Sequence, residues 1–283
     1  MKALITTYSP VNNSIRKLVA AFQNFSIEPD IICTKFDLLS PSDNTPSETV
    51  YDIVINRNLY GIPTSYWNKY ISKHTRQLNQ EHLKNHTLYD KFTQYITLST
   101  NPNIPLIPTY FSRGIQSYET LCKKFQDSRF IAKPKGGSLG KAVSLITHQD
   151  ELTEYYNEYL PVEIIFQQYI PIQFDLRIIV LGGNVLGALQ RIKGKDSLTT
   201  NISQGNEGRK YICSEELERL AIETCNTLKL EYAGVDILLD ENNHPKVIEV
   251  NQFPHFIGFD QVNESNTALD IVTYLIETSR QYK

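Results

Sequence analysis

The sequence lacks the features that would place it in a membrane, on nucleic acid or outside the cell. No apolar run in its 283 residues approaches the roughly 20 residues that a membrane-spanning helix needs. The formal net charge of −3 supplies no basic field for binding nucleic acid. The first ten residues show no signal-peptide cleavage pattern. We therefore expect a cytoplasmic protein with neither a membrane nor a nucleic-acid partner.

Motifs for zinc, disulfides and dinucleotides are also missing. The four cysteines are scattered without CxxC spacing, so we expect reduced thiols. His82 and His86 are four residues apart, but no third ligand is near in sequence, and a solvated helix is favoured over a zinc site. No GxGxxG follows the first expected strand, which argues against a dinucleotide-binding opening domain.

Alternating apolar runs and amphipathic stretches predict an α/β protein. In residues 1–56 the alternation favours a parallel sheet with crossover helices. The proline-rich segment 101–110 breaks regular structure and marks a boundary, whereas segment 193–209 is polar and predicted to be a mobile loop. We expect domains over 1–100, 101–170 and 171–283. The expected strands are 2–7, 30–34, 51–56, 129–134, 142–147, 162–170, 175–180 and 185–192, and the expected helices are 12–25, 87–99, 214–230 and 267–279. Ser214 is the expected N-cap of helix 214–230, whose apolar stripe is Leu217, Leu220, Ala221, Thr224, Cys225 and Leu228.

Residues 231–251 carry the strongest chemical signal. Two apolar runs flank a polar turn centred near residues 242–243, the pattern of a β-hairpin. Asp236 then faces Glu249, and Asn251 lies on the same face. Two opposed carboxylates repel each other unless a positive charge lies between them, so neutralising one is expected to leave the metal-free protein as stable or more stable. Carboxylate and amide oxygens suit magnesium bridged to phosphates.

The rest of the hairpin decides between two interpretations of this acidic face. An isolated hairpin with such a face is more often simply solvated. Here Leu238 is expected to face Val247 on that face, which favours a covered site. Gly234, without a side chain, is expected opposite Asn251. The other face is predicted to point into the core with Val235, Ile237, Leu239, Ile248 and Val250.

Glycine-rich and basic segments add weaker signals. The KGGSLGK segment between two expected strands can bring backbone N–H groups to phosphates, although an ordinary hairpin turn has the same composition. It is not a Walker motif. Whether Arg177 and Arg191 share a face of a second hairpin depends on the register of its Gly-Gly-Asn turn. Arg57, at the end of an expected strand, either reaches a substrate or forms a surface salt bridge.

Taken in order, these segments resemble the RimK-type branch of the ATP-grasp superfamily. The resemblance covers roughly residues 88–260 and rests on Lys133, KGGSLG, QQYI, DLR, GGNVLGALQR, TTN, AGVDIL and VIEVN. It implies two α+β subdomains that clasp ATP, preceded by a small α/β domain. The N-terminal region matches loosely, through its alternation and the DIVINR segment.

The resemblance also implies roles for individual residues. Arg177 and Arg191 would face the γ-phosphate and the acyl-phosphate formed from it. Magnesium, expected as two ions that Mn²⁺ can replace, would be held by Asp236, Glu249 and Asn251, with Asn201 beside it or beside a phosphate. The implied ATP contacts are Lys91 and Lys133 on phosphates, the loop residues Gly136, Gly137, Ser138 and Gly140, the adenine hinge Gln167, Gln168, Tyr169 and Ile170, and Asp175 at the ribose.

The sequence departs from the family pattern in two segments, of which the second, beside the acceptor pocket in such enzymes, concerns the substrate. An RSN-like triplet is Thr199-Thr200-Asn201 here, and small-Pro-Gly after the metal asparagine is replaced by residues 252–256, QFPHF. The implied activity is amide formation between a carboxylate and an amine through an acyl-phosphate. A hydroxyl kinase and a non-catalytic nucleotide-binding module are the alternatives. The acid, the amine, the linear or cyclic nature of the product and a homo-oligomeric state stay open.

Overall fold

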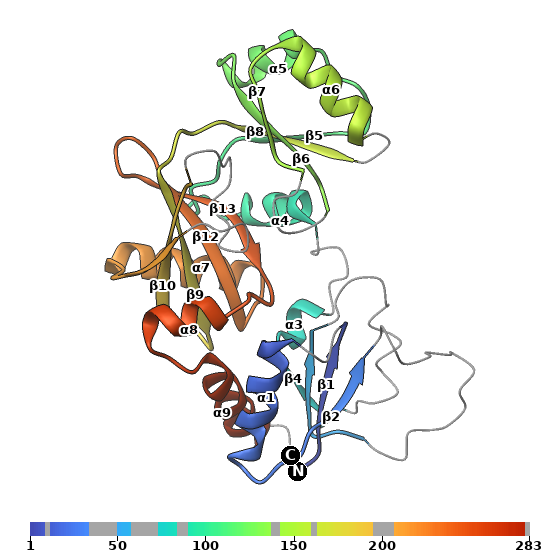
Figure 1. Ribbon diagram of the computed structural model, residues 1–283, viewed down its shortest axis with the longest axis vertical. Coiled ribbons are helices and arrows are strands. Elements are labelled where there is room, and N and C mark those ends of the chain that lie inside the picture. Colours follow the sequence, from blue (N-terminus) through green and yellow to red (C-terminus); the bar gives the residue numbers. More distant parts are fainter. Residues whose placement is uncertain are drawn as a thin grey trace, which may run out of the picture.

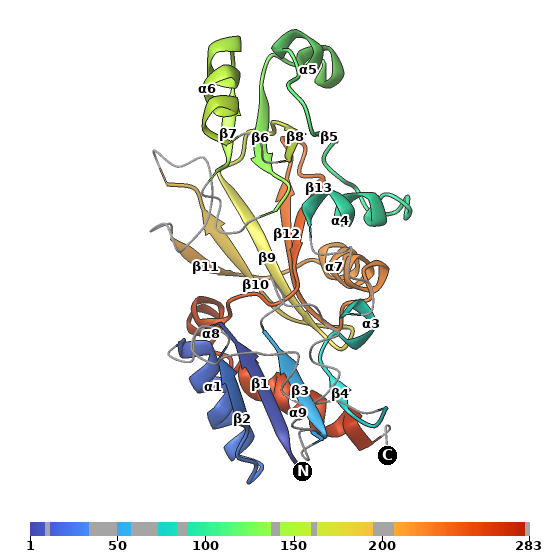
Figure 2. The same ribbon diagram turned by 90° about the vertical axis from the view of Figure 1, so that its right-hand side faces the viewer.

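Three β-sheets lie one above another along the long axis of the molecule (Figures 1 and 2). The computed structural model describes residues 1–8, 12–33, 50–57, 73–83, 90–136, 142–159, 163–194 and 207–280. The sheet from the start of the chain lies at one end, the small sheet from the middle at the other, and the largest sheet between them.

The first sheet is parallel, as the alternation predicted. Its strand order is β2-β1-β3-β4, so the chain moves from β1 to one side and then returns to the other. Asn12 caps the helix by accepting a hydrogen bond from the Ser14 N–H. The elements are β1 (Ala3–Thr7), α1 (Asn13–Gln23), β2 (Asp30–Cys33), β3 (Ile53–Asn56) and β4 (Arg76–Gln77).

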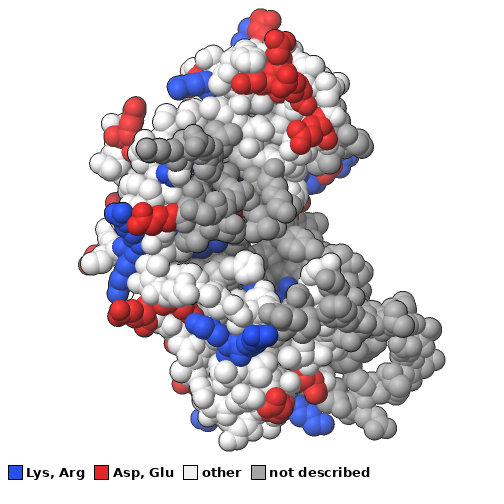
Figure 3. Space-filling model, in the orientation of Figure 1, with Lys and Arg blue, Asp and Glu red and all other residues white. Residues whose placement is uncertain are grey.

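Two short helices lead to the second sheet. α3 (Gln80–Leu83) and α4 (Lys91–Leu98) follow the first sheet in sequence. The helix expected from residue 87 begins only at Lys91, because Asp90 is extended and caps it, and residues 84–89 lie outside the described ranges. The second sheet is antiparallel, in the order β5-β8-β6-β7. Its strands are β5 (Thr109–Ser112), β6 (Phe130–Pro134), β7 (Ser144–Ile146) and β8 (Ile164–Gln168). The helices of the same segment are α5 (Tyr118–Phe125) and α6 (Gln149–Tyr159). Figure 3 shows acidic side chains gathered over α6.

The third sheet is antiparallel and carries both sequence-predicted hairpins. Its order is β11-β10-β9-β12-β13, and α7 packs on one face through the apolar stripe that the sequence predicted. The expected loop 193–209 is wrong at its end, because β11 begins at Gly208 and pairs with β10; residues 195–206 lie outside the described ranges. The elements are β9 (Phe174–Leu181), β10 (Asn184–Ile192), β11 (Gly208–Tyr211), α7 (Glu215–Thr227), β12 (Tyr232–Leu239), β13 (Pro245–Asn251), α8 (Ile257–Asn263) and α9 (Thr267–Ser279).

The register of the β12–β13 hairpin confirms one prediction and corrects another. Asp236 pairs with Glu249, as expected. A bulge follows, so that Ile237 pairs with Val247, and Leu238 does not face Val247. The extra residue is Ile248, and Val247 takes the core position predicted for it.

A buried asparagine connects the first sheet to the third. Asn79 is fully buried, and its left-handed backbone (φ 58°) is one that asparagine tolerates. Its Oδ1 accepts from the N–H groups of Glu231 and Tyr232, both at 2.8 Å. Its Nδ2 donates to the carbonyls of Tyr232 at 2.8 Å and Gln252 at 3.0 Å. All four hydrogen-bonding positions of this amide are therefore used.

The neighbouring polar side chains complete this junction. Arg76, 1% exposed, forms an ion pair with Glu231 and lies over the ring of Tyr274 at 5.5 Å from the centroid. His82 is also fully buried, and its Nδ1 lies 2.8 Å from the Leu228 carbonyl oxygen. The predicted solvated helix is thus wrong at His82, because its ring is buried against the carboxyl end of α7.

Candidate active site

Six of the predicted site residues converge on one face of the third sheet. They are Asp175, Arg177, Arg191, Asp236, Glu249 and Asn251. Strand pairing places Arg191 opposite Asp175, Arg177 beside Asp236, and Gly234 opposite Asn251. Because side chains alternate along each strand, these pairings direct the acidic and basic groups to the face opposite α7. The register therefore answers the open question: both arginines lie on the same face.

Ion pairs hold this cluster together. Arg177 binds Asp236 through Nε and Nη2, each at 2.7 Å. Arg191 binds Asp175 in the same bidentate way, at 2.7 and 2.6 Å, and its Nη2 also lies 3.0 Å from Asp236. Asn251 donates its amide N–H to Asp236 at 3.2 Å, which leaves its carbonyl oxygen for another partner.

The charges in the cluster are balanced rather than repulsive. Burial on its own raises the pKa of Asp236, but Arg177 and Arg191 outweigh it, and the net pKa lies below the ordinary value. Burial also opposes the charge of Arg191, yet Asp236 and Asp175 raise its pKa overall. Asp236 therefore stays ionised although only 3% of it is exposed. The positive charge that opposed carboxylates require comes from the two arginines.

Two lysines approach the other carboxylate from α4 and the second sheet. The Lys91 ammonium lies 3.9 Å from Glu249. Lys133, on β6, is buried and donates to the side-chain oxygen of Gln167 at 3.0 Å. Burial lowers the pKa of Lys133; the charge of Glu249 raises it and that of Lys91 lowers it. Lys133 is thus within electrostatic range of both Glu249 and Lys91, which brings residues from the second and third sheets to one place.

The remaining predicted residues are placed less closely or not at all. Gln168 ends β8, and its N–H donates to the Pro108 carbonyl at 2.9 Å. Tyr169 lies under the guanidinium of Arg129, 5.3 Å from the ring centroid, and Ile170 follows it. Gly136 is exposed. Outside the described ranges lie Gly137, Ser138, Gly140 and Asn201.

The segment after Asn251 folds back over the hairpin. A Cβ on Gly234 would lie 2.9 Å from the Cβ of Pro254, closer than carbon atoms approach. Glycine is therefore required at this position so that segment 252–256 can pass over β12. The sequence placed Gly234 opposite Asn251, but nothing in it could show that a proline from the next loop covers it.

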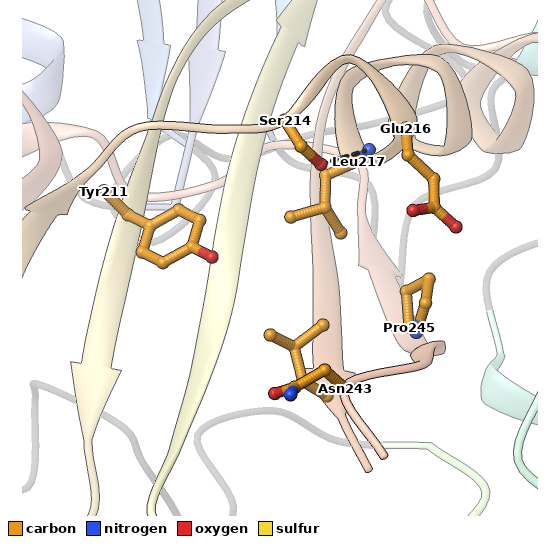
Figure 4. Close-up of a pocket in the computed structure, with 7 residues that line it drawn as sticks. Tyr211, Ser214, Glu216, Leu217, Asn243 and Pro245 are labelled. Carbon is orange, nitrogen blue, oxygen red and sulfur yellow. Dashed lines mark hydrogen bonds between the residues drawn. The ribbon is translucent and has the colours of Figure 1, made fainter.

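A pocket of about 230 Å³ lies on the α7 side of the third sheet (Figure 4). It opens between β11, the start of α7 and the turn of the β12–β13 hairpin. None of its lining residues belongs to the ion-pair cluster, so it is separate from the candidate site. The lining is Tyr211, Ser214, Glu216, Leu217, Leu239, Asn243 and Pro245.

Sequence comparison identifies the family. The profile of a RimK-like ATP-grasp domain matches residues 88–275. The chain belongs to this family. The resemblance drawn from the motifs is thereby confirmed.

Individual relatives of this RimK-like chain are ligases. The tetrahydromethanopterin:alpha-L-glutamate ligase of Methanocaldococcus jannaschii is 30% identical over 202 residues, 66% of each chain. A probable alpha-L-glutamate ligase of Marinomonas sp. strain MWYL1 is 25% identical, over 99% of this chain and 96% of the relative. The first three curated relatives are nevertheless matched over less than two thirds of their own length, at 66%, 40% and 42%.

Solved structures confirm the expected ATP-grasp fold. The ATP-grasp ligase PsnB, complexed with a minimal precursor, Mg and ADP, superimposes with a TM-score of 0.72 at 15% identity, over 98% of both chains. In this RimK-like chain, no described helix is long and apolar enough to cross a membrane. Within the same described ranges, no three His, Cys, Asp or Glu side chains converge as a metal site.

Proposed function

We propose that the protein is an ATP- and Mg²⁺-dependent ligase that joins a carboxylate to an amine. The observation that supports this most is the cluster of Asp236, Glu249 and Asn251 beside two arginines and two lysines. Two carboxylates and an amide oxygen are hard donors that fit magnesium. The ligase names of the relatives, and the Mg and ADP named with PsnB, point the same way.

The chemistry follows from where the charges lie. A substrate carboxylate oxygen attacks the γ-phosphorus of ATP and releases ADP, which gives an acyl-phosphate. The amine nitrogen then attacks the acyl carbon, phosphate leaves, and the nitrogen loses a proton. Both steps gather negative charge on phosphoryl oxygens, which fixed cations stabilise without reorganisation. Bound magnesium would add Lewis-acid stabilisation of the same oxygens.

Each cation has a place in this proposal. Lys91 and Lys133 bind phosphates already present in ATP, and the Gln167 bond holds the Lys133 ammonium on the sheet face. Arg177 keeps one nitrogen, Nη1, outside its pair with Asp236 and directs it to the transferring phosphoryl group. Arg191, more deeply buried, orients Asp236 and places Asp175 for the ribose.

The division into residues 1–100, 101–170 and 171–283 remains part of the proposal. In it, ATP lies between the second and third sheets, with residues 167–170 pairing with adenine and the KGGSLGK segment covering the phosphates. The approach of Lys133 to Glu249 across these two sheets supports this position for the phosphates.

Trapping with hydroxylamine tests the reaction. An acyl-phosphate is an activated acid, so hydroxylamine should yield a hydroxamate together with ADP and phosphate. The assay uses ATP, Mg²⁺ and candidate acids: glutamate-tailed peptides, free amino acids and cell extract. A stable phosphate ester without hydroxamate would instead identify a hydroxyl kinase. Nucleotide binding without turnover on any acid would favour a non-catalytic module.

A further inference from the structure

Arg57 lies where an open parallel sheet binds ligands. It follows β3, and its N–H donates to the Thr6 carbonyl of β1 at 3.0 Å. The side chains of Thr6 and Asn56 are joined by a buried hydrogen bond of 2.6 Å, which fixes the two strand ends. The chain leaves β1 toward β2 on one side and returns to β3 on the other. Such a switch point leaves a crevice outside the carboxyl ends of the strands, where ligands bind in sheets of this type.

The guanidinium of Arg57 has no anionic partner in the described part of the chain. It is partly buried, with Cζ 5.8 Å from the centroid of the buried Phe256 ring. No hydrogen bond or ion pair joins its side chain to a described residue. Burial lowers the pKa of Arg57, but arginine remains charged at neutral pH. A cation held away from water is stabilised by a bound anion, and no described residue supplies one to Arg57.

The described polar side chains near Arg57 supply no free carboxylate to pair with it. Desolvation, followed by the charges of Arg57 and Arg177, lowers the pKa of the exposed His255. The Tyr232 hydroxyl is fully buried, senses both arginines, and has no hydrogen-bond partner among the described residues. The nearby carboxylate of Asp260 is already engaged by Lys17 at 2.8 Å and by three donors of the α8–α9 connection. Among the described residues where the first and third sheets meet, Arg57 therefore carries a positive charge that no carboxylate pairs with.

We propose that Arg57, together with His255, binds a spectator carboxylate, meaning a substrate carboxylate that stays ionised through both steps. This assignment rests on the ligase proposal. The reacting carboxylate loses its charge when it becomes an acyl-phosphate and then an amide, so a cation dedicated to it would lose its partner. A carboxylate that takes no part in the reaction keeps the pair intact. A planar guanidinium binds such a group through two hydrogen bonds.

The spectator carboxylate can belong to the acid or to the amine substrate. Both sources present the same chemistry to Arg57. In either case the enzyme selects a substrate with at least one carboxylate that is not consumed, and replacing that group by an amide should remove the selection. QFPHF, at residues 252–256, supplies His255 and Phe256, so the segment that departs from the family pattern is the one that faces Arg57.

Direct binding tests the proposal without turnover. The probes are L-glutamate and its two monoamides, L-glutamine and L-isoglutamine, because each amide removes one of the two carboxylates. They are titrated by calorimetry into wild type, Arg57→Gln and Arg57→Lys loaded with Mg²⁺ and ADP, and the preference is measured for glutamate over the amide that binds more weakly. Arg16→Gln, at an exposed position on α1, is the control for loss of one charge. We expect wild type and the control to prefer glutamate about tenfold or more, as one charge-assisted pair provides. Arg57→Gln should lose the preference, and Arg57→Lys should keep part of it. No preference in wild type, or one that survives Arg57→Gln, overturns the proposal.

Kinetics then separate the two sources and the underlying reaction. With hydroxylamine in place of the amine, a raised KM for the acid in Arg57→Gln assigns the carboxylate to the acid. A KM raised only for the amine in the complete reaction assigns it to the amine. A raised KM for ATP alone would mean that Arg57 binds phosphate, and would also overturn the assignment. Absence of hydroxamate from wild type contradicts the ligase reaction, whereas the calorimetric preference does not depend on it. Arg57→Gln should melt no earlier than wild type, because it removes a cation that has no anionic partner among the described residues.

Discussion

Asp236→Asn should destabilise the protein even in the absence of metal. If Asp236 were simply one of two opposed carboxylates, neutralising it would keep or raise the stability of the protein. The structure reverses the sign, because the carboxylate lies between Arg177 and Arg191 at 2.7 to 3.0 Å. An amide at this position keeps the shape but removes the charge. Arg191 retains Asp175, whereas Arg177, 16% exposed in its side chain, loses its carboxylate partner.

The magnitude follows from the burial of the pair. Removing one partner of a buried ion pair costs about 3–5 kcal/mol. The amide oxygen introduced by Asp236→Asn can still accept a hydrogen bond, and Arg177 reaches some solvent. We therefore expect a loss of stability at the lower end of this range, about 3 kcal/mol. Glu249→Gln is the matched control, since Glu249 is 28% exposed and its lysine is 3.9 Å away. An exposed pair of this kind contributes roughly 0–1 kcal/mol.

Denaturant unfolding of the metal-free variants measures the difference. The folded-state pKa of Asp236 is lowered, so its stabilisation is present above the pKa of the unfolded chain and is lost as pH falls through the folded-state value. The gap between wild type and Asp236→Asn should therefore be full at pH 7 and close in acid. Both variants should lose ATP turnover. Unfolding of Asp236→Asn at the wild-type denaturant concentration, or above it, would refute the reasoning.

Five further outcomes are expected. Lys133→Ala should raise KM for ATP more than it lowers kcat, as steady-state kinetics can show, because it contacts phosphates of the ground state. Since burial lowers the pKa of Lys133, ATP affinity should fall on alkalinisation earlier than for an ordinary lysine, and Lys133→Arg should remove that dependence in calorimetric titrations. Arg177→Lys should mainly lower kcat; an effect on KM alone would assign it to substrate binding. Asn79→Ala should lower the free energy of unfolding by about 2 kcal/mol, because backbone groups in two segments lose buried partners, and an unchanged denaturation midpoint would contradict this. Burial raises the pKa of Cys225 to about 12, so a thiol reagent at pH 8 should react with it only after unfolding.

Local patterns predicted the parts of the fold that local forces determine. Ser214 caps α7, and the stripe beginning at Leu217 is buried, because helix capping and periodicity act within a few residues. The facing of Asp236 and Glu249 follows from turn position and strand alternation in the same way. The bulge at Ile248 does not follow from these local patterns, because β13 also contacts a segment that is distant in the sequence. Its edge is contacted from outside by the Pro105 carbonyl, which accepts from the Val247 N–H at 2.8 Å.

The ionic arrangement of the site could not be predicted from the hairpin alone. The partners of Asp236 come from β9 and β10, more than 40 residues earlier, and the register between these two strands shifts at a bulge at Leu186. α6 was missed because its buried side, including Tyr155 and Tyr156, consists largely of tyrosines that resemble a polar surface in the sequence. Its helical spacing was present but carried little apolar contrast.

The hydrophobic core around β1 also includes side chains of α9, from the other end of the described chain. α9 packs against α1, and one apolar cluster contains Ile5 of β1, Phe22 of α1 and Leu275 of α9. In both views α9 lies alongside the first sheet (Figures 1 and 2). During synthesis the first sheet therefore keeps part of its apolar surface uncovered until residues 267–279, which form α9, have been made. A chain cut before residue 267 would lack α9 and would leave the apolar face shared by β1 and α1 partly uncovered.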